Sequence, residues 1–146
     1  MSVGPVTDFL VTMEALYTAI YNQLNSSTLA PKWNILKYGG TNVEGLFRLV
    51  PAQKLPAAII AYDSSKYYDG KQRRNSIFHV LIVVRAPADP FADGLVVTSE
   101  YATEAMKLLD WRIISGQAKI EVMSDDAIDL GPSVAAQDVK FIIKDH

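Results

Sequence analysis

Histidine is the side chain that most often performs acid–base chemistry near neutral pH, and the chain contains two, His79 and His146. His79 stands in an apolar run beside Ile77 and Leu81, a pattern typical of a buried strand. A general base needs a cleft and a positioned partner, and the sequence indicates neither at this position. We therefore expect His79 to be a hydrogen-bonded structural histidine, and the terminal His146 to be frayed.

Three aspartates form the densest acidic cluster, Asp125, Asp126 and Asp129, in the segment SDDAIDLGP. Their spacing does not match the calcium-loop pattern Dx[DN]x[DN]G, and Gly131 falls at the wrong place for the turn that such a loop requires. The segment is expected to be a solvated loop between two strands. We predict no metal site and no catalytic role for it.

Other chemical signatures are absent from the sequence. It has no GxSxG elbow, no phosphate loop of the GxGxxG or GxxxxGK[ST] type, and no HExxH pair. The chain also has no cysteine, which excludes thiolate catalysis, disulfides and cysteine-ligated zinc or iron–sulfur sites. The sequence therefore predicts no catalytic residues and no cofactor.

The most unusual polar segment, DSSKYYDGKQRRNS, lies between the two most apolar runs of the chain. Basic residues interleaved with aromatic ones suit a nucleic-acid backbone and its bases, but tyrosine and arginine are also enriched in protein interfaces. A plain solvated loop is the third interpretation. The formal charge of -2 argues against nucleic acid as the partner, and we predict a protein interface. Its residues are Lys66, Tyr67, Tyr68, Lys71, Arg73 and Arg74.

The two apolar runs, Leu55–Tyr62 and Phe78–Val84, predict the strands of a long β-hairpin. The segment Ser64–Asn75 between them, here called the arm, is expected to leave the sheet as a protruding loop with its turn at Asp69-Gly70. Both faces of the second strand are largely apolar. It is therefore predicted to be a central strand, covered by helices on one face and by a second layer or a neighbouring subunit on the other.

Amphipathic helices are predicted on either side of this hairpin. The first runs from Thr7 to about Asn25, with apolar residues at spacings of three and four. The second is expected to begin at Thr98 or Ser99, either of which can cap a helix, and to continue to about Trp111. These two helices supply the apolar faces that can cover the sheet.

The remaining segments predict further strands. Trp33–Tyr38 could be an edge strand, while Val43–Val50 could be a strand or an extended loop. Alternating residues predict strands at Ala118–Met123 and Ala135–Lys144. The expected fold is one α+β domain over residues 1–146, with a mainly antiparallel sheet of four to five strands, two helices packed on one face and a protruding hairpin arm.

Length and composition agree with a single compact domain. A chain of 146 residues can bury roughly two-thirds of its unfolded surface without disulfides or metals. Asp8 and Glu14 fall where the apolar region of a secretory signal would lie, and no apolar run approaches the ~18 residues of a membrane helix. We expect the protein to stay in the cytoplasm where it is made.

The order of these elements resembles the small tail-terminator or tail-completion proteins of long-tailed bacteriophages and prophages, including Mu-like phages. The resemblance spans Thr7 to Ile143. It rests on the segments MEALYTAIYNQL, LPAAIIAY, FHVLIVVRA, SEYATEAMKLLDW and AAQDVKFII, and on the long arm between the second and third of them.

This resemblance implies a structural virion protein without enzymatic activity. Such a protein forms a homo-oligomeric ring, commonly a hexamer, which caps the tail tube and joins it to the head-completion or connector proteins. It would be found in the virion, and in the host cytoplasm during assembly. Two other classes remain open from the residues: a small enzyme or ligand-binding domain with its site between sheet and helices, and a nucleic-acid-binding accessory protein that uses the basic arm.

Overall fold

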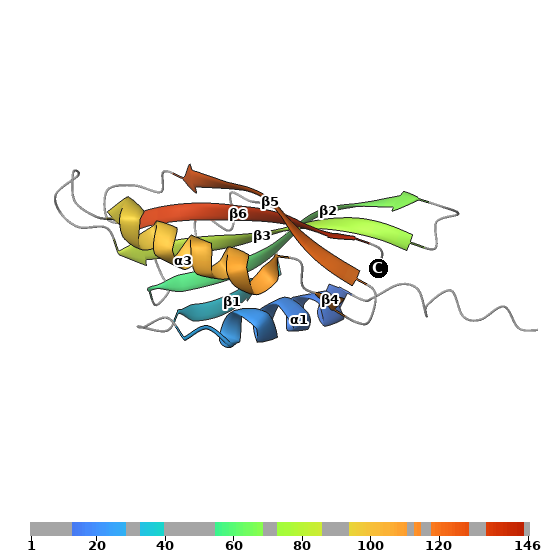
Figure 1. Ribbon diagram of the computed structural model, residues 1–146, viewed down its shortest axis with the longest axis horizontal. Helices are drawn as coiled ribbons and strands as arrows, with labels where there is room; N and C mark the ends of the chain where they lie inside the picture. Colours follow the sequence, from blue (N-terminus) through green and yellow to red (C-terminus); the bar gives the residue numbers. More distant parts are fainter. Residues whose placement is uncertain are drawn as a thin grey trace, which may run out of the picture.

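The computed structural model describes residues 13–28, 33–39, 55–68, 73–85, 94–110, 113–114, 118–128 and 134–144. Figure 1 shows these elements as one layer of strands with helices beside it. In chain order they are α1 (Met13–Asn25), β1 (Asn34–Tyr38), β2 (Ala57–Tyr68), β3 (Arg73–Arg85), α3 (Gly94–Leu109), β4 (Ile113–Ile114), β5 (Ala118–Ile128) and β6 (Val134–Lys144).

The strands form one six-stranded sheet in the order β1-β2-β3-β6-β5-β4. All neighbouring pairs are antiparallel except β1 and β2, which are parallel. The predicted α+β class and mainly antiparallel sheet are confirmed. Five strands have five residues or more, as expected, and the two-residue β4 was not predicted. β3 lies inside the sheet between β2 and β6, also as predicted.

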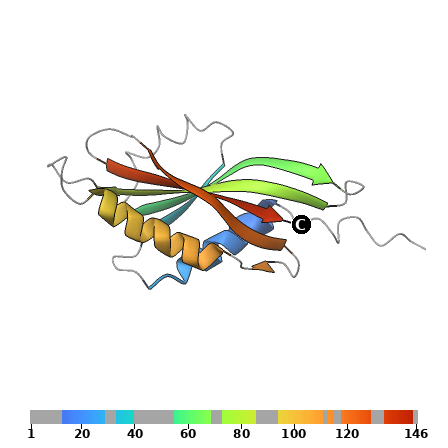
Figure 2. The same cartoon turned by 45° about the horizontal axis from the view of Figure 1, so that its top comes forward.

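Both helices cover the same face of the sheet, as Figure 2 shows. The apolar stripe of α1 buries Leu16, Ile20 and Leu24 completely, and α3 buries Ala102 and Leu109. These side chains pack on alternate residues of four strands, β2, β3, β6 and β5, because successive side chains of a strand point to opposite faces. The strand residues in this main core are Ala58, Ile60, Phe78, Val80, Ile82, Val84, Ile120, Val139, Phe141 and Ile143.

The opposite face carries a smaller apolar cluster and then becomes polar toward the arm. Ile59, Leu81 and Val83 are buried on this face, and Leu36 and Ile128 are among the residues packed against them. The predicted second apolar face of β3 is therefore confirmed. Because Leu81 and Val83 are already buried in a single copy of the chain, no neighbouring subunit is needed to cover them.

Local contacts fix the C-terminal end of α1. α1 ends at Asn25, where Ser26 and Ser27 donate backbone hydrogen bonds to the carbonyls of Gln23 and Leu24. The Trp33 indole then donates to the Leu24 carbonyl over 3.1 Å, which holds the next segment against the helix end.

Among the described residues, no helix is long and apolar enough to cross a membrane.

The predicted start of the second helix at Thr98 or Ser99 is wrong. α3 begins at Gly94, and Thr98 is fully buried inside the helix rather than capping it. Burial of this helix against the sheet outweighs the weak local preference of threonine for a cap. The expected first turn of the N-terminal helix, before Met13, and the segment Val43–Val50 lie outside the described residues.

Three strands are longer than their apolar runs predicted. β2 continues to Tyr68 and β3 begins at Arg73, so most of the arm is paired strand rather than loop. β5 continues through Asp125 to Ile128, so much of the expected acidic loop is also strand. In both cases pairing with a neighbouring strand satisfies the backbone hydrogen bonds, which allows polar side chains to continue a strand beyond its apolar residues.

We expect Ile82→Ala to lower the free energy of unfolding by about 2–5 kcal/mol, because Ile82 of β3 is fully buried in the main core beneath the helices. The matched control is Met123→Ala, since Met123 is 50% exposed and its truncation leaves no cavity. Urea unfolding of the two variants measures the difference. A loss below about 1 kcal/mol for Ile82→Ala would show that the main core lies elsewhere.

Candidate functional site

The arm is an extension of the two central strands beyond the rest of the sheet. The β2–β3 ladder continues to the pair Tyr68 and Arg73, whereas β6 stops pairing with β3 at Ser76. β1 stops pairing with β2 at Ala61. Past these points the arm is a two-stranded ribbon without another described strand beside it, and Figure 1 shows it extending past the end of the sheet.

The structure brings the predicted arm residues together on this ribbon. Lys66 is exposed, and Arg74 is half-buried opposite Tyr67 in the ladder. Tyr68 and Arg73 pair with each other nearer the tip. The side chains of Tyr67, Tyr68 and Arg73, and the whole of Lys71, lie outside the described part of the molecule. The backbone thus places basic residues on both strands of the arm.

A β-bulge marks the root of the arm. The register between β2 and β3 shifts between Tyr62 and Ser64, which leaves Asp63 as the extra residue. Just beyond it, Ser65 forms hydroxyl hydrogen bonds with Tyr62 at 2.7 Å and with the buried Ser76 at 2.6 Å. The bond between Ser65 and Ser76 connects the two strands where the flanking strands end, and the bond to Tyr62 spans the bulge within β2. A bulge increases the local twist of a ribbon, so it sets the direction in which the arm leaves the sheet.

His79 joins three strands at this root, on the face opposite the helices. Its Nδ1 lies 2.7 Å from Oδ2 of Asp138 on β6, and its Nε2 lies 2.8 Å from Oδ2 of Asp63 in the bulge. The hydrogen bond with Asp138, followed by the one with Asp63, raises the pKa of His79 above its ordinary value, although burial opposes this. A protonated ring donates to both carboxylates at once.

This geometry favours a structural ion pair over a catalytic base. A general base must offer a ring nitrogen to its substrate, and both nitrogens of His79 are already bonded to carboxylates. The prediction of a hydrogen-bonded structural histidine agrees with these contacts. The reasoning behind it was wrong on one point, because we inferred from the sequence that His79 lacks a partner, and it has two.

No local pattern could have revealed these partners. Asp138 lies two residues from Lys140, which is the register partner of His79, so it reaches the ring diagonally across the ladder. Asp63 reaches it only because of the bulge. Their sequence separations from His79 are 59 and 16 residues. The contact therefore depends on strand register, which a single sequence does not specify.

The first two aspartates of the acidic cluster lie on strand β5 rather than in a turn. Asp125 and Asp126 are both exposed, and Asp125 accepts a hydrogen bond of 2.5 Å from the amide of Gln137. Asp126 is the register partner of Asp138. Asp129 lies outside the described residues. In the part of the chain that the structure describes, no group of three or more acidic, histidine or cysteine side chains is arranged to hold a metal ion.

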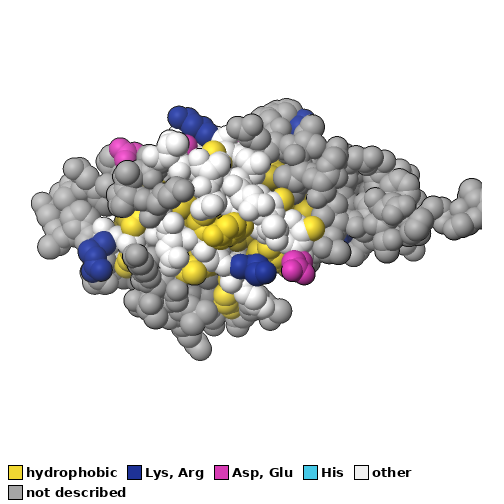
Figure 3. Space-filling model, turned by 90° about the horizontal axis from the view of Figure 1, so that it is seen from below, with side chains coloured by type: hydrophobic (Ala, Val, Ile, Leu, Met, Phe, Trp, Pro, Cys, Tyr) yellow, Lys and Arg dark blue, Asp and Glu magenta, His cyan; other side chains and the backbone are white. Residues whose placement is uncertain are grey.

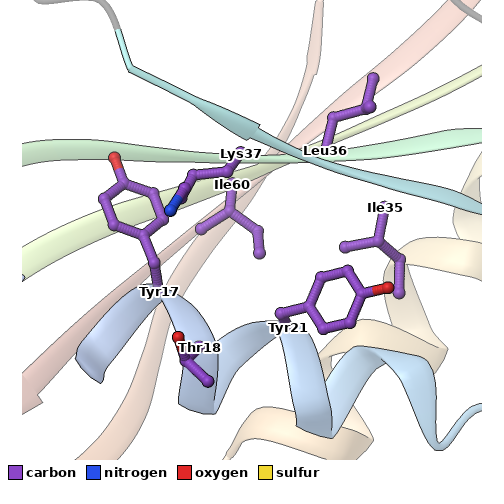
Figure 4. Close-up of a pocket in the computed structure, with 7 residues that line it drawn as sticks. All are labelled: Tyr17, Thr18, Tyr21, Ile35, Leu36, Lys37 and Ile60. Atoms are coloured by element: carbon purple, nitrogen blue, oxygen red, sulfur yellow. The ribbon is translucent and has the colours of Figure 1, made fainter. Parts of the chain in front are cut away.

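A hollow of about 310 Å³ lies between α1 and the β1–β2 edge of the sheet. Figure 4 shows Tyr17 and Tyr21 rising from α1 on either side of it, with Ile60 between them and Lys37 reaching toward Tyr17. The Lys37 ammonium lies 5.5 Å from the centre of the Tyr17 ring. The other described residues that line it are Thr18, Ile35 and Leu36, so the described part of the hollow has no carboxylate or histidine.

Tyr17 also holds the parallel strand in place. Its hydroxyl donates to the carbonyl of Tyr38, at the end of β1, over 3.1 Å, and accepts from the backbone N–H of Tyr62 on β2 over 3.0 Å. The hydroxyl thus bridges two strands just where their own ladder ends. Burial raises the pKa of Tyr17, so the hydroxyl keeps its proton for this bond at neutral pH.

The surface on the α1 side has an apolar centre. Figure 3 shows hydrophobic side chains gathered in the middle of this view, with charged groups directly beside them and others toward its margins. Tyr21, on α1, is 43% exposed. Its ring lines the hollow instead of entering the core.

Comparisons with known proteins identify a fold but not a family. No protein-family model matches the chain, and no curated protein matches it. Among solved structures, the chain is similar to a chain in the virion of a native gene transfer agent particle, with a TM-score of 0.57 and 13% sequence identity. The match covers 97% of this chain and 98% of that chain. The two therefore share one fold over their whole length.

We expect His79→Gln to remove a pH-dependent part of the stability. Since the folded state raises the pKa of His79, the stabilisation is fully present below the ordinary pKa of about 6.5 and is lost as the pH rises through the folded value. On this face the ring contacts Asp63 and Asp138. Lys140 is opposite His79 in the ladder, and Asp126 is opposite Asp138 on the next strand.

Urea unfolding at a series of pH values measures this effect as the difference between wild type and His79→Gln. His146→Gln, which removes the other histidine, is the control. The difference should shrink from acid to alkaline pH for His79→Gln only. A difference that stays constant with pH would contradict a charged bridge.

Tyr17→Phe should lower the free energy of unfolding by about 1–3 kcal/mol, because it leaves the Tyr38 carbonyl and the Tyr62 N–H without their shared partner. Tyr21→Phe, in the same helix and lining the same hollow, is the matched control and should change little. Equal effects in the two variants would show that the bridge contributes nothing.

Proposed function

We propose that this protein is a structural component of a phage-like virion, and within that class a tail-terminator or tail-completion protein. The observation that carries the proposal is the end-to-end fold similarity to a chain of a gene transfer agent virion, which covers nearly all of both chains. The order of elements, which resembles tail terminators, supports the same class. A fold can serve several functions, so the more specific role rests on the surface features as well.

The surface suits a protein that works through contacts rather than through chemistry. The arm leaves the sheet as a two-stranded ribbon with basic residues on both strands. Its root is tied by serine, tyrosine and histidine hydrogen bonds, so its direction is defined. The arm residues Lys66, Tyr67, Tyr68, Lys71, Arg73 and Arg74 are the proposed protein interface. Arginine suits such contacts because it forms two hydrogen bonds to one carboxylate.

In this role the chain forms a homo-oligomeric ring that ends the growth of the tail tube. The ring is a hexamer, as is common among tail terminators. Its partners are other copies of itself, the tail tube protein and a head-completion or connector protein. The chain would act without enzymatic activity, first in the host cytoplasm during assembly and then in the virion. The overall charge of -2 disfavours nucleic acid as a further partner.

A small-molecule site is the second candidate function, and the hollow beside Tyr17 is the observation that favours it. Its volume of about 310 Å³ is at the lower end of ligand pockets. Lys37 is the single charged residue among the described residues that line it, so these residues offer no pair for acid–base catalysis. This alternative can be tested by measuring whether small carboxylates or aromatic compounds raise the melting temperature. If Tyr21→Ala, which changes the lining of the hollow, binds the same compounds as well as wild type, the hollow is not their binding site.

Reversing the charge of the arm, with Arg73→Glu and Arg74→Glu together, should weaken ring assembly and tube capping. The reason is that these arginines would otherwise pair with acidic groups of a neighbour. Light scattering after size-exclusion chromatography measures the assembly, and electron microscopy measures the lengths of tail tubes. The stability of the isolated fold should change by no more than about 0.5 kcal/mol. A variant that assembles and caps tubes like wild type would remove the arm from the interface.

A further inference from the structure

One side edge of the sheet has no described partner strand along the acidic half of β5. The two-residue β4 pairs only with Ala118 and Lys119, and the Asp110 carboxylate accepts the N–H of Val122 over 2.9 Å. From Met123 to Ile128, here called the β5 edge, no described residue pairs with the outer side of the strand. An unpaired strand edge presents a row of backbone N–H and C=O groups that another strand can bind.

Side-chain exposure shows that this edge is accessible on both faces. The five consecutive residues from Met123 to Ala127 are all exposed, although alternate residues of a strand point to opposite faces. Met123 is 50% exposed and stands at the bulge between Val122 and Ser124. A strand that is open on both faces and along its outer side has room for a second strand beside it.

The charges on this edge select what can bind there. Asp125 and Asp126 are adjacent and exposed, and no described cation forms an ion pair with either of them. If the β5 edges of two copies paired with each other, these carboxylates would gather at one contact, and like charges across a ladder destabilise it. The charges therefore disfavour pairing between two β5 edges and favour pairing of the β5 edge with a basic strand.

The arm of another copy is such a strand. It is a ribbon whose outer sides carry no described strand, and Lys66 and Arg74 lie on its two strands. We propose that the arm of one copy lies along the β5 edge of the next copy, with Lys66 and Arg74 facing Asp125 and Asp126. This inference rests on the proposed ring and names the surfaces that form it.

The position of the two surfaces determines the kind of assembly. In the strand order, β2 and β3 are separated from the outer side of β5 by β6, so the arm and the β5 edge are different patches of one molecule. A contact between unlike patches is head-to-tail, and it produces a ring when the rotation between copies closes. Backbone pairing supplies affinity in such a strand addition, and the charge pairs supply selectivity.

A charge swap tests this contact. Variant A carries Lys66→Glu and Arg74→Glu, and variant B carries Asp125→Lys and Asp126→Lys. Each variant alone puts like charges at every contact, so the concentration at half-assembly should rise about tenfold or more. The control, Arg85→Glu with Lys107→Glu, makes the same change of net charge as variant A, at two exposed residues outside both surfaces. It should assemble like wild type.

Mixing the two variants provides the decisive test. In an equal mixture, the basic arm of B can bind the acidic edge of A, and the acidic arm of A can bind the basic edge of B. Assembly should therefore return in the mixture, and in one chain that carries all four changes. Circular dichroism of each variant confirms that it is folded. Light scattering after size-exclusion chromatography reports the assembly.

The outcomes separate this contact from the proposed ring. Suppose that wild type forms rings. If variant A then assembles equally well, or if neither the mixture nor the fourfold variant recovers assembly, the arm does not bind the β5 edge, although the proposed ring is unaffected. If wild type stays monomeric at every concentration, the proposed ring fails and this contact fails with it.

Discussion

The fold depends on β3 being buried on both faces while it pairs along both edges. Leu81 and Val83 are covered on one face, and Phe78, Val80 and Ile82 are covered by the helices on the other. A strand of this kind is stable only inside a sheet, with β2 and β6 as its neighbours. The two helices then cover one face together, because the alternate residues of β3 present a continuous apolar surface to them.

The arm follows from the unequal lengths of these strands. β2 and β3 have 12 and 13 residues, and they continue to pair after β1 and β6 have ended. On the face opposite the helices, His79 binds Asp63 and Asp138 at the root of the arm. One ion-pair network therefore joins the bulge of β2 to the middle of the sheet. A rigid root of this kind reduces the conformational entropy that is lost when the arm binds a partner.

Periodicity predicted the parts of the fold that burial controls. The strands around Phe78 and Phe141, the helix stripe through Leu16 and Ile20, and the edge strand ending at Tyr38 agree with the structure. It failed where pairing, not burial, extends an element, as at Lys66 and Asp125, which follow the end of an apolar run. It also missed the partners of His79, because a β-bulge and the register of β6 bring them together and neither has a local signature. The candidate interface was visible in the sequence as composition, but its ribbon geometry was not.

We propose that the arm is the element through which copies of this chain contact each other in a closed ring. Electron cryomicroscopy of the assembled wild-type protein tests it directly, because the map shows which elements of neighbouring copies touch. The account predicts a closed ring in which every arm lies on the adjacent subunit and is as well ordered as the sheet. A ring whose arms project freely into solvent, with subunits joined through the helices instead, would contradict it.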